Sequence, residues 1–309
     1  MIEIAGPGDV RRCPACDCAD AREVGPKNGY QMLSCFSCRT LFSACLPGAE
    51  YSYNDYYESD NLCVPEAIVE RIEEIVESFG AYRAHNRLLD VGFGAGSYLS
   101  AASKAGWNAS GIEVSKPAFE QARKAGLDVF CGQLLEAHYP ENYFDVVLAV
   151  EVLEHLPRPR ELVREISRIL RPCGLFWATT PHCEGLSYRL MGLSWSVVSP
   201  PEHFQLFSRK GMAMFLKSAG FRQIELRTHG LNVAELFQGL QARISAFAHP
   251  KKTNDDPRQT EEVFNRVGSA YSLNIAMMQG RTRKRAKTII NDVLNALRHG
   301  DTLKIKAGL

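Results

Sequence analysis

Two pairs of cysteines near the beginning of the sequence have the spacing of metal ligands. Four of the ten cysteines form the pattern Cys13-x2-Cys16-x18-Cys35-x2-Cys38. Two tight turns that each direct two thiolates at one point are what a tetrahedral zinc ion needs. Because four protein ligands leave no coordination position open, the pattern predicts a structural zinc site in a ribbon. It departs from the usual ribbon at Asp17 and Arg39, where such turns carry glycine, and Cys18 is a competing ligand.

A glycine-rich turn with acidic neighbours is the second feature that could do chemistry. Gly92, Gly94 and Gly96 follow a short apolar run that contains Asp90. Glycine permits positive φ and lets a ligand approach the backbone closely. The spacing does not match the dinucleotide pattern G-x-G-x-x-G, and no Lys-Ser or Lys-Thr follows as in a phosphate loop. Carboxylates at Asp90 and at Glu113, in the next apolar run, predict a nucleoside ligand with a cationic tail.

These residues lie at the ends of short apolar runs that alternate with helical patterns. We expect strands at residues 88–91, 108–114, 128–131, 144–150, 175–180, 221–227 and 301–307, and helices at 98–105, 116–125, 160–170 and 210–219. The alternation predicts an α/β fold with a Rossmann-like, doubly wound sheet. Residues 231–300 break the alternation, and we expect a helical insertion there, before the closing strand.

Several blocks of the sequence agree, in order, with one family of α/β enzymes. Residues 90–115 (DVGFGAGSYLSAASKAGWNASGIEVS) carry the glycine turn and both carboxylates. Residues 144–147 with 151–156, then 168–174 and 201–208, are further matching blocks. Together they resemble the class I S-adenosylmethionine-dependent methyltransferases. The resemblance implies a seven-stranded Rossmann-like sheet and S-adenosylmethionine as the cofactor.

The same resemblance implies roles for individual residues. The three glycines of the turn would line the methionine part of the cofactor, with Asp90 near its amino group. Glu113 would hold the ribose hydroxyls, and Val114 would pack on the adenine. Gln133 and Leu134 would lie near the adenine amino group, with Gln133 standing where relatives often carry Asp. The implied cofactor site therefore consists of Asp90, Gly92, Gly94, Gly96, Glu113, Val114, Gln133 and Leu134.

Two histidines are candidates for catalytic work at the methyl acceptor. Methyl transfer from a sulfonium is an in-line displacement, and an oxygen or nitrogen acceptor benefits from a base of near-neutral pKa. His155 follows Glu154 after the apolar run at 144–150, and His203 stands in Pro201-x-His203-Phe204. Both would lie at the carboxyl edge of the sheet, where acceptors bind in such folds. The alternative for each is a structural role, as a helix cap or as a partner of a backbone carbonyl.

Composition and charge exclude several classes of protein. The chain has 309 residues and a formal net charge of +1, which excludes a globally basic nucleic-acid-binding protein. The run Val146–Val150 is too short to span a membrane. No apolar stretch stands near the N-terminus, so we expect no export and a cytoplasmic location. The basic run Arg281–Lys287 is compatible with RNA or anionic lipid headgroups, with a solvated helix start as the alternative.

Taken together, these features predict an enzyme with a small additional domain. We expect a zinc ribbon over residues 1–50, a linker over 51–64 and a methyltransferase domain over 65–309, with the insertion at 231–300 and the closing strand at 301–307. The predicted reaction transfers a methyl group to a small-molecule or carbohydrate-type acceptor, at oxygen, in a biosynthetic pathway. This organisation is similar to that of bacterial methyltransferases of polysaccharide and secondary-metabolite pathways. The alternatives are an RNA methyltransferase and a non-catalytic cofactor-binding or interaction module.

Overall fold

The computed structural model of the chain describes residues 11–46, 66–233, 235–236 and 281–309. The expected linker at 51–64 and residues 237–280 of the expected insertion lie outside the described residues. The chain divides into two compact units. The larger consists of residues 1–181, 199–227 and 303–309, and the smaller of residues 182–198 and 228–302. All of the site residues that the sequence predicts belong to the larger unit.

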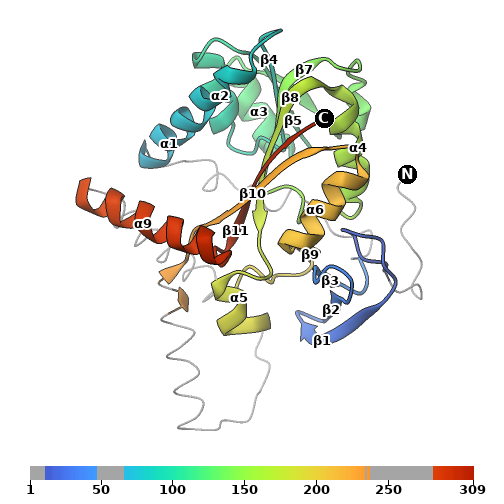
Figure 1. Ribbon diagram of the computed structural model, residues 1–309. Coiled ribbons are helices and arrows are strands. Elements are labelled where there is room, and N and C mark those ends of the chain that lie inside the picture. The colour runs from blue at the N-terminus through green and yellow to red at the C-terminus, as the bar shows by residue number, and fades with distance from the viewer. Residues whose placement is uncertain (1–10, 47–65, 234, 237–280) are drawn as a thin grey trace. The chain divides into compact units, whose positions relative to one another are not determined.

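The larger unit is built on a seven-stranded sheet (Figure 1). Its strands are β4 (Arg87–Val91), β5 (Asn108–Glu113), β6 (Asp128–Cys131), β7 (Phe144–Val150), β8 (Leu170–Pro181), β10 (Gln223–His229) and β11 (Thr302–Gly308). Their order is β10-β11-β8-β7-β4-β5-β6, and the pairs β5–β6, β4–β5, β4–β7 and β7–β8 are parallel. The winding reverses between β4 and β7, and doubly wound sheets bind ligands beyond the strand ends at such a point. The expected α/β class and the seven strands are confirmed.

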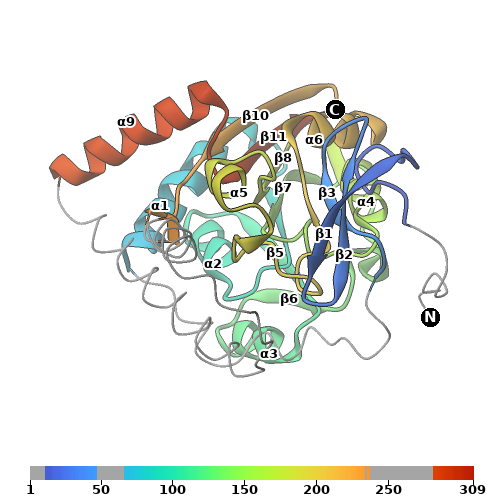
Figure 2. The ribbon, with the colours of Figure 1, turned by 90° about the horizontal axis from the view of Figure 1, so that it is seen from below.

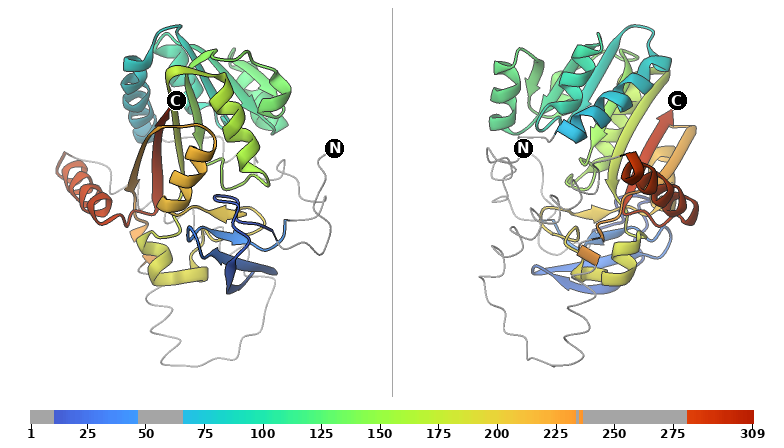
Figure 3. Two further views of the ribbon diagram at one scale, coloured as in Figure 1. Left: turned by 45° about the vertical axis from the view of Figure 1, so that its right-hand side comes forward. Right: turned by 90° about the vertical axis from the view of Figure 1, so that its left-hand side faces the viewer.

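Helices cover both faces of this sheet (Figure 3). They are α1 (Glu66–Glu77), α2 (Ser97–Lys104), α3 (Lys116–Lys124), α4 (Pro159–Ile169) and α6 (Arg209–Ser218), with 3-10 turns η3 (Ser78–Tyr82) and η4 (Leu134–Ala137). Alternate residues of β7 serve opposite layers. Val146 and Leu148 belong to the core that includes α1 and α2, whereas Val147 and Ala149 belong to the core that includes α4 and α6. Both faces of β7 are buried, which explains why its sequence is continuously apolar.

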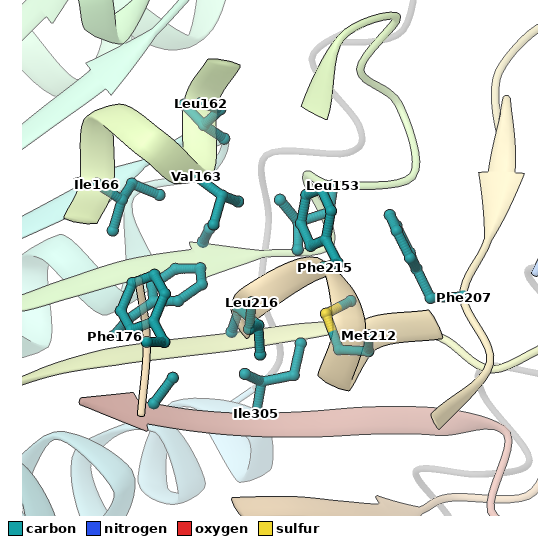
Figure 4. Close-up of a cluster of buried hydrophobic side chains, with 14 of the residues drawn as sticks. Leu153, Leu162, Val163, Ile166, Phe176, Phe207, Met212, Phe215, Leu216 and Ile305 are labelled. Atoms are coloured by element: carbon teal, nitrogen blue, oxygen red, sulfur yellow. The ribbon is translucent and has the colours of Figure 1, made fainter. Parts of the chain in front are cut away.

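The core under α4 and α6 holds the carboxyl edge of the sheet in place (Figure 4). Ile166 of α4 and Leu216 of α6 pack there with Phe176 of β8 and Ile305 of β11, and all four side chains are 0% exposed. Burial of each such side chain stabilises the fold by about 1.5–3 kcal/mol. The loops that follow β7 and β8 therefore start from rigid strands.

Strand β8 begins earlier than the sequence pattern predicts. We expected this strand at 175–180, and its start was wrong. Leu170 already pairs with Phe144, and the register shifts before pairing resumes at Val146. Cys173, in the extra residues, has a φ of 60°. Residues 171–174 form a bulge inside a longer strand, because Leu170 and Leu175 on either side both pair with β7.

The cysteine pairs lie in a second, four-stranded antiparallel sheet. Its strands are β1 (Ala21–Lys27), β2 (Tyr30–Cys35), β3 (Leu41–Ser43) and β9 (Gln205–Leu206), in that order. Because β9 follows β8 in the chain, residues beyond the large sheet supply the last strand of the ribbon. The ribbon lies beside α4 and α6 (Figure 2). Arg160 of α4 donates to the Ala15 carbonyl at 2.9 Å, and the Ser208 hydroxyl before α6 donates to the Cys38 carbonyl.

The smaller unit contains α5 (Leu186–Met191), η5 (Gly192–Ser194) and α9 (Arg281–Leu297). The basic run at 281–287 forms the first turns of α9. Within this unit, the buried Asp301 carboxylate accepts hydrogen bonds from the backbone N and the hydroxyl of Ser187 at 2.9 and 2.6 Å. Nδ1 of His182 lies 3.0 Å from the Gly300 carbonyl oxygen. None of the described helices of the chain combines the length and apolar character needed to cross a lipid bilayer.

Candidate functional site

The glycine-rich turn connects β4 to α2 at the carboxyl edge of the large sheet. Gly92, Gly94 and Gly96 have positive φ values of 69°, 52° and 71°. A Cβ on Gly92 would lie 2.7 Å from Cγ2 of Val152, which belongs to the loop after β7. Position 92 therefore requires glycine for both its backbone conformation and its space. The same contact places the loop after β7 directly beside the turn.

Glu113 fastens the glycine turn to the end of β5. Its side chain is buried, and Oε2 accepts a hydrogen bond from the Gly94 backbone N at 3.0 Å. Oε1 accepts from the backbone N atoms of Val114 and Ser115 at 2.8 and 2.9 Å. A carboxylate can accept about four hydrogen bonds, so capacity remains for a ligand hydroxyl. The Val114 side chain, next in the chain, is 45% exposed and offers an apolar surface beside that carboxylate.

Asp90 is a buried carboxyl group. Among the described residues, no cation is found with the groups that shift its pKa. Its side chain is only 2% exposed at the end of β4. Burial and the Glu113 carboxylate raise the pKa of Asp90 to about 7. Burial, reinforced by Asp90, also raises the pKa of Tyr98 in α2. Ionisation of Asp90 is therefore costly, and a ligand ammonium group would lower that cost.

Gln133 and Leu134 lie at the end of β6, next to β5. The backbone N of Gly132 donates to the Glu113 carbonyl at 2.9 Å, which keeps the two strand ends together. Gln133 is exposed, and its backbone N donates to the Glu136 carboxylate at 2.7 Å, which opens η4. The Leu134 side chain is instead buried in the main core. Of the two side chains, only that of Gln133 is therefore exposed.

Both predicted histidines lie together at the same edge of the sheet. One ligand atom from each of Glu154, His155 and His203, which we call the histidine cluster, lies within 4.8 Å of the others. The His155 and His203 rings meet edge to face with centroids 4.6 Å apart. Nδ1 of His155 lies 2.9 Å from the Glu202 carbonyl oxygen. Burial, and secondarily His203, lower the pKa of His155 to about 3, so this imidazole is neutral near pH 7.

The sequence did not single out Glu154 as a functional residue. Its side chain is fully buried, Oε2 accepts a hydrogen bond from the Thr180 hydroxyl at 2.9 Å, and Oε1 has no partner in the described part of the chain. Burial and the Glu151 carboxylate raise the pKa of Glu154 well above its usual range. Glu151 itself has a φ of 53°, a strained conformation for this residue type. The available signal was the motif Glu151-x-x-Glu154-His155 directly after a buried strand.

The four ribbon cysteines, which we call the cysteine cluster, also come together. Sγ of Cys13 lies 3.5 Å from Sγ of Cys38, Sγ of Cys16 lies 3.5 Å from Sγ of Cys35, and all four lie within 4.8 Å of one another. Four thiolates at about 2.3 Å from a tetrahedral zinc ion would stand about 3.8 Å apart. The hydrogen bond between the Cys13 and Cys38 thiols lowers the pKa of Cys38 to about 5 and, with burial, raises the pKa of Cys13.

The two cysteine turns share one backbone geometry despite their lack of glycine. The backbone N of Asp17 donates to the Cys13 carbonyl and that of Arg39 to the Cys35 carbonyl, each at 2.9 Å. Asp17 and Arg39 have φ values of 63° and 66°, so each adopts the left-handed conformation that glycine usually supplies. Cys18 lies outside the cluster, with its thiol directed to the Asp20 carbonyl at 3.8 Å.

Comparison with known proteins identifies the class. Residues 64–226 match a family model described as a methyltransferase domain. Because this match covers more than half of the chain, the chain belongs to the methyltransferase-domain family. A crystal structure of a SAM-dependent methyltransferase from Archaeoglobus fulgidus shares the fold, with a TM-score of 0.52 and 17% identity over 84% of this chain and 100% of that one. The family match and the shared fold thus agree on a methyltransferase domain.

Curated relatives act on chemically different acceptors, as their names state. The ubiquinone biosynthesis O-methyltransferase of Ralstonia nicotianae is 30% identical over 158 residues, which cover 47% of this chain and 66% of that protein. The 24-methylenesterol C-methyltransferase 2 of Oryza sativa subsp. japonica is 34% identical over 124 residues, which cover 36% of this chain and 33% of that protein. The chain therefore spans between one third and two thirds of these relatives' lengths.

Proposed function

We propose that this chain transfers the methyl group of S-adenosylmethionine to an oxygen atom of a small-molecule or carbohydrate-type acceptor. The observation that carries the proposal is the pair of buried carboxylates at neighbouring strand ends. Glu113 retains hydrogen-bonding capacity for a ribose beside the exposed Val114, and no cation of the described residues is among the groups that shift the pKa of the buried Asp90. A nucleoside with an amino-acid tail supplies both groups.

The chain's residues fit this ligand at each of its parts. Asp90 would accept from the amino group, the turn at Gly92, Gly94 and Gly96 would admit the methionine portion, and Glu113 would accept from the ribose hydroxyls. Val114, Gln133 and the backbone of Leu134 would surround the adenine. When bound, the cofactor supplies an activated methyl group on a sulfonium. Close packing of Val152 on Gly92 brings the loop after β7 to the methionine end of this site.

His155 and His203 would act on the acceptor. In the reaction, the acceptor oxygen forms a bond to the methyl carbon, the carbon–sulfur bond breaks with its electron pair moving to sulfur, and the acceptor's proton leaves. His203 would help this proton leave, whereas His155, whose pKa of about 3 makes it a weak base, would help to hold the acceptor in place. We infer an oxygen acceptor because a hydroxyl needs this help, and because the relative from Ralstonia nicotianae is named as an O-methyltransferase. The sterol relative is named as a C-methyltransferase, which makes carbon the competing acceptor atom.

The cysteine cluster would hold one structural zinc ion. Its sulfur separations fit tetrahedral coordination, and four protein ligands close the site. The proposed zinc would join the turn at Cys13–Cys16 to the turn between β2 and β3, whose Cys38 carbonyl accepts from Ser208 after β9. None of the nine described cysteines forms a disulfide, which fits the reducing cytoplasm that the sequence favours.

Transfer of labelled methyl groups to a panel of hydroxyl-bearing metabolites tests the proposal. We expect one labelled small-molecule product and stoichiometric S-adenosylhomocysteine. Label in RNA, with RNA binding that weakens steeply as the salt concentration rises, would instead favour an RNA methyltransferase that binds RNA through the basic start of α9. Tight cofactor binding with no labelled product would favour a non-catalytic module.

A further inference from the structure

We infer that Glu154, His155 and His203 bind a divalent transition-metal ion that holds the acceptor's oxygen in place for methyl transfer. This inference rests on the proposed function, because it names the group that acts on the acceptor at the same edge of the sheet. In this arrangement the two imidazoles are ligands, and the cation, not a histidine, makes the acceptor's proton easier to remove.

The donor set is the first support. One carboxylate oxygen and two imidazole nitrogens converge within 4.8 Å of one another. Two histidines with one carboxylate are a recurrent set for zinc and other first-row divalent ions, and three ligands leave positions open for water or substrate. The cysteine cluster, by contrast, would close all four positions. The histidine cluster therefore has the composition of a site that works on a ligand.

The hydrogen bonds behind the histidines orient them as metal ligands. A carbonyl oxygen can only accept, so His155 must carry its proton on Nδ1, which lies 2.9 Å from the Glu202 carbonyl. The Ser199 hydroxyl donates to the Glu202 carboxylate at 3.1 Å and lies 3.2 Å from Nδ1 of His203. Having donated its proton, that hydroxyl accepts from His203. With the proton of each ring on Nδ1, Nε2 is the nitrogen that carries the lone pair a metal ion needs, and the partner of Nδ1 fixes the ring's orientation.

Glu154 supplies an independent observation. Its side chain is completely buried, and Oε1 has no hydrogen-bond partner in the described part of the chain. The Thr180 hydroxyl holds the other oxygen at 2.9 Å, so the carboxylate is positioned and not merely enclosed. A buried oxygen without a partner is costly unless something binds it. The nearby Glu151, whose φ is 53°, adds a second carboxylate beside Glu154. A bound cation would stabilise this pair of negative groups, whereas a bound anion would be repelled by it.

The location connects the ion to the methyl transfer. Residues 151–156 follow β7, which neighbours β4, and Val152 touches Gly92 of the cofactor turn. A divalent ion lowers the pKa of a hydroxyl that coordinates it, in the way that it activates water. The hydroxyl's proton would pass to solvent, its oxygen would take the methyl group, and the sulfur would keep the electron pair of the broken bond. The oxidation state of the ion does not change.

Binding of Mn²⁺ to the full-length, zinc-replete protein tests this inference. Mn²⁺ favours oxygen and nitrogen ligands over thiolates, so the cysteine cluster does not compete. Electron paramagnetic resonance of free Mn²⁺ should show one saturable site per chain. Glu154→Gln and His203→Ala should each weaken binding about tenfold or more. The matched control is His85→Ala, whose exposed side chain lies near the opposite edge of the sheet and should leave binding unchanged.

Absence of saturable Mn²⁺ binding by the wild type, or equal binding by His203→Ala, would overturn the inference. If Glu154→Gln does not fold, as judged by circular dichroism, Mn²⁺ binding by His155→Asn and His203→Ala tests the site instead, because both histidine side chains are only half-buried. Calorimetry of S-adenosylmethionine in the same preparations separates this inference from the proposed function. Cofactor binding without Mn²⁺ binding refutes the metal site alone, and Mn²⁺ binding without cofactor binding refutes the proposed function alone.

Discussion

The cysteine cluster and the histidine cluster both bring potential metal ligands within 4.8 Å of one another, but they are built from different parts of the chain. The cysteine cluster comes from two matching turns of one small sheet. The histidine cluster comes from two loops at the edge of the large sheet, 47 residues apart at the His155–Glu202 contact. Soft ligands that close a site suit a structural ion, whereas mixed ligands that leave it open suit chemistry.

The two clusters also differ in how much of the fold supports them. The ribbon has three short strands of its own and depends on β9 and on contacts from α4 and α6 for its remaining support. A segment of this size buries too little apolar surface to fold alone, and a metal commonly replaces the missing core. The histidine cluster stands on β7 and β8, which are buried on both faces. Loss of its ion should change activity and leave the fold intact.

The largest expected effect is on the cysteine cluster. Cys35→Ser should abolish the proposed zinc content of about one ion per chain and lower the unfolding temperature markedly, since structural zinc can contribute on the order of 10 kcal/mol to small domains. Metal analysis and thermal unfolding measure the two effects. Cys45→Ser, at an exposed ribbon position outside the cluster, is the control. A Cys35→Ser protein with unchanged zinc and unfolding temperature contradicts the assignment.

The next effect concerns the histidine cluster. His203→Ala should lower kcat about 100-fold or more while the Kd for S-adenosylmethionine and the unfolding temperature stay near those of the wild type. Steady-state kinetics with the acceptor found by the labelling screen gives kcat, and calorimetry gives Kd. His85→Ala should behave as wild type in both assays. An unchanged kcat would remove His203 from the reaction, and a large drop in stability would make its role structural.

Glu113→Ala should weaken S-adenosylmethionine binding by about tenfold or more, because it removes the acceptor of the ribose hydroxyls and the partner of three backbone N atoms. Calorimetry is the measurement. Glu120→Ala removes an exposed carboxylate from the neighbouring helix α3 and serves as control. If Glu113→Ala binds the cofactor as tightly as the wild type, the ribose does not lie at Glu113.

Cofactor affinity should depend on pH through Asp90. Its pKa of about 7 in the ligand-free fold exceeds the usual carboxyl value, so Asp90 binds a proton below pH 7 that a cationic ligand must displace. Affinity should therefore fall by up to about tenfold per pH unit below 7 and level off above it. Because the pKa of Asp90 is raised in the folded state, its contribution to the stability of the ligand-free protein is greatest at acid pH. This contribution is lost as the pH rises through 7. Asp90→Asn should flatten the pH profile of Kd, and an unchanged profile contradicts the assignment.

The smallest expected effect concerns the turns of the ribbon. Arg39→Gly should stabilise the protein by about 1 kcal/mol, because glycine adopts the φ of 66° without the steric cost that arginine incurs. Asp17→Gly should gain less, since aspartate tolerates this conformation better and Asp17 pairs with Arg12 at 3.2 Å. Thermal unfolding compares the two variants. Destabilisation by Arg39→Gly would show that its side chain outweighs the backbone strain.

Local sequence features predicted much of this molecule. Continuous apolar runs and glycine spacing located β4, β5 and β7 and the turn at Gly92, because burial on both faces and positive φ leave direct marks on residue type. The convergence of His155 with His203 was expected only from resemblance. The pairing of β3 with β9 and the role of Glu202 behind both histidines were not predicted. They depend on contacts between distant segments, and no local periodicity encodes such contacts.

Calorimetric titration of the wild-type protein with S-adenosylmethionine, with NAD as the comparison ligand, tests whether Asp90, Glu113 and the glycine turn form a cofactor site. The carboxylates at Asp90 and Glu113 and the glycine spacing predict one saturable site per chain for S-adenosylmethionine, competition by S-adenosylhomocysteine and no binding of NAD. Absence of S-adenosylmethionine binding, or NAD bound in competition with it, would show that these residues do not form an S-adenosylmethionine site.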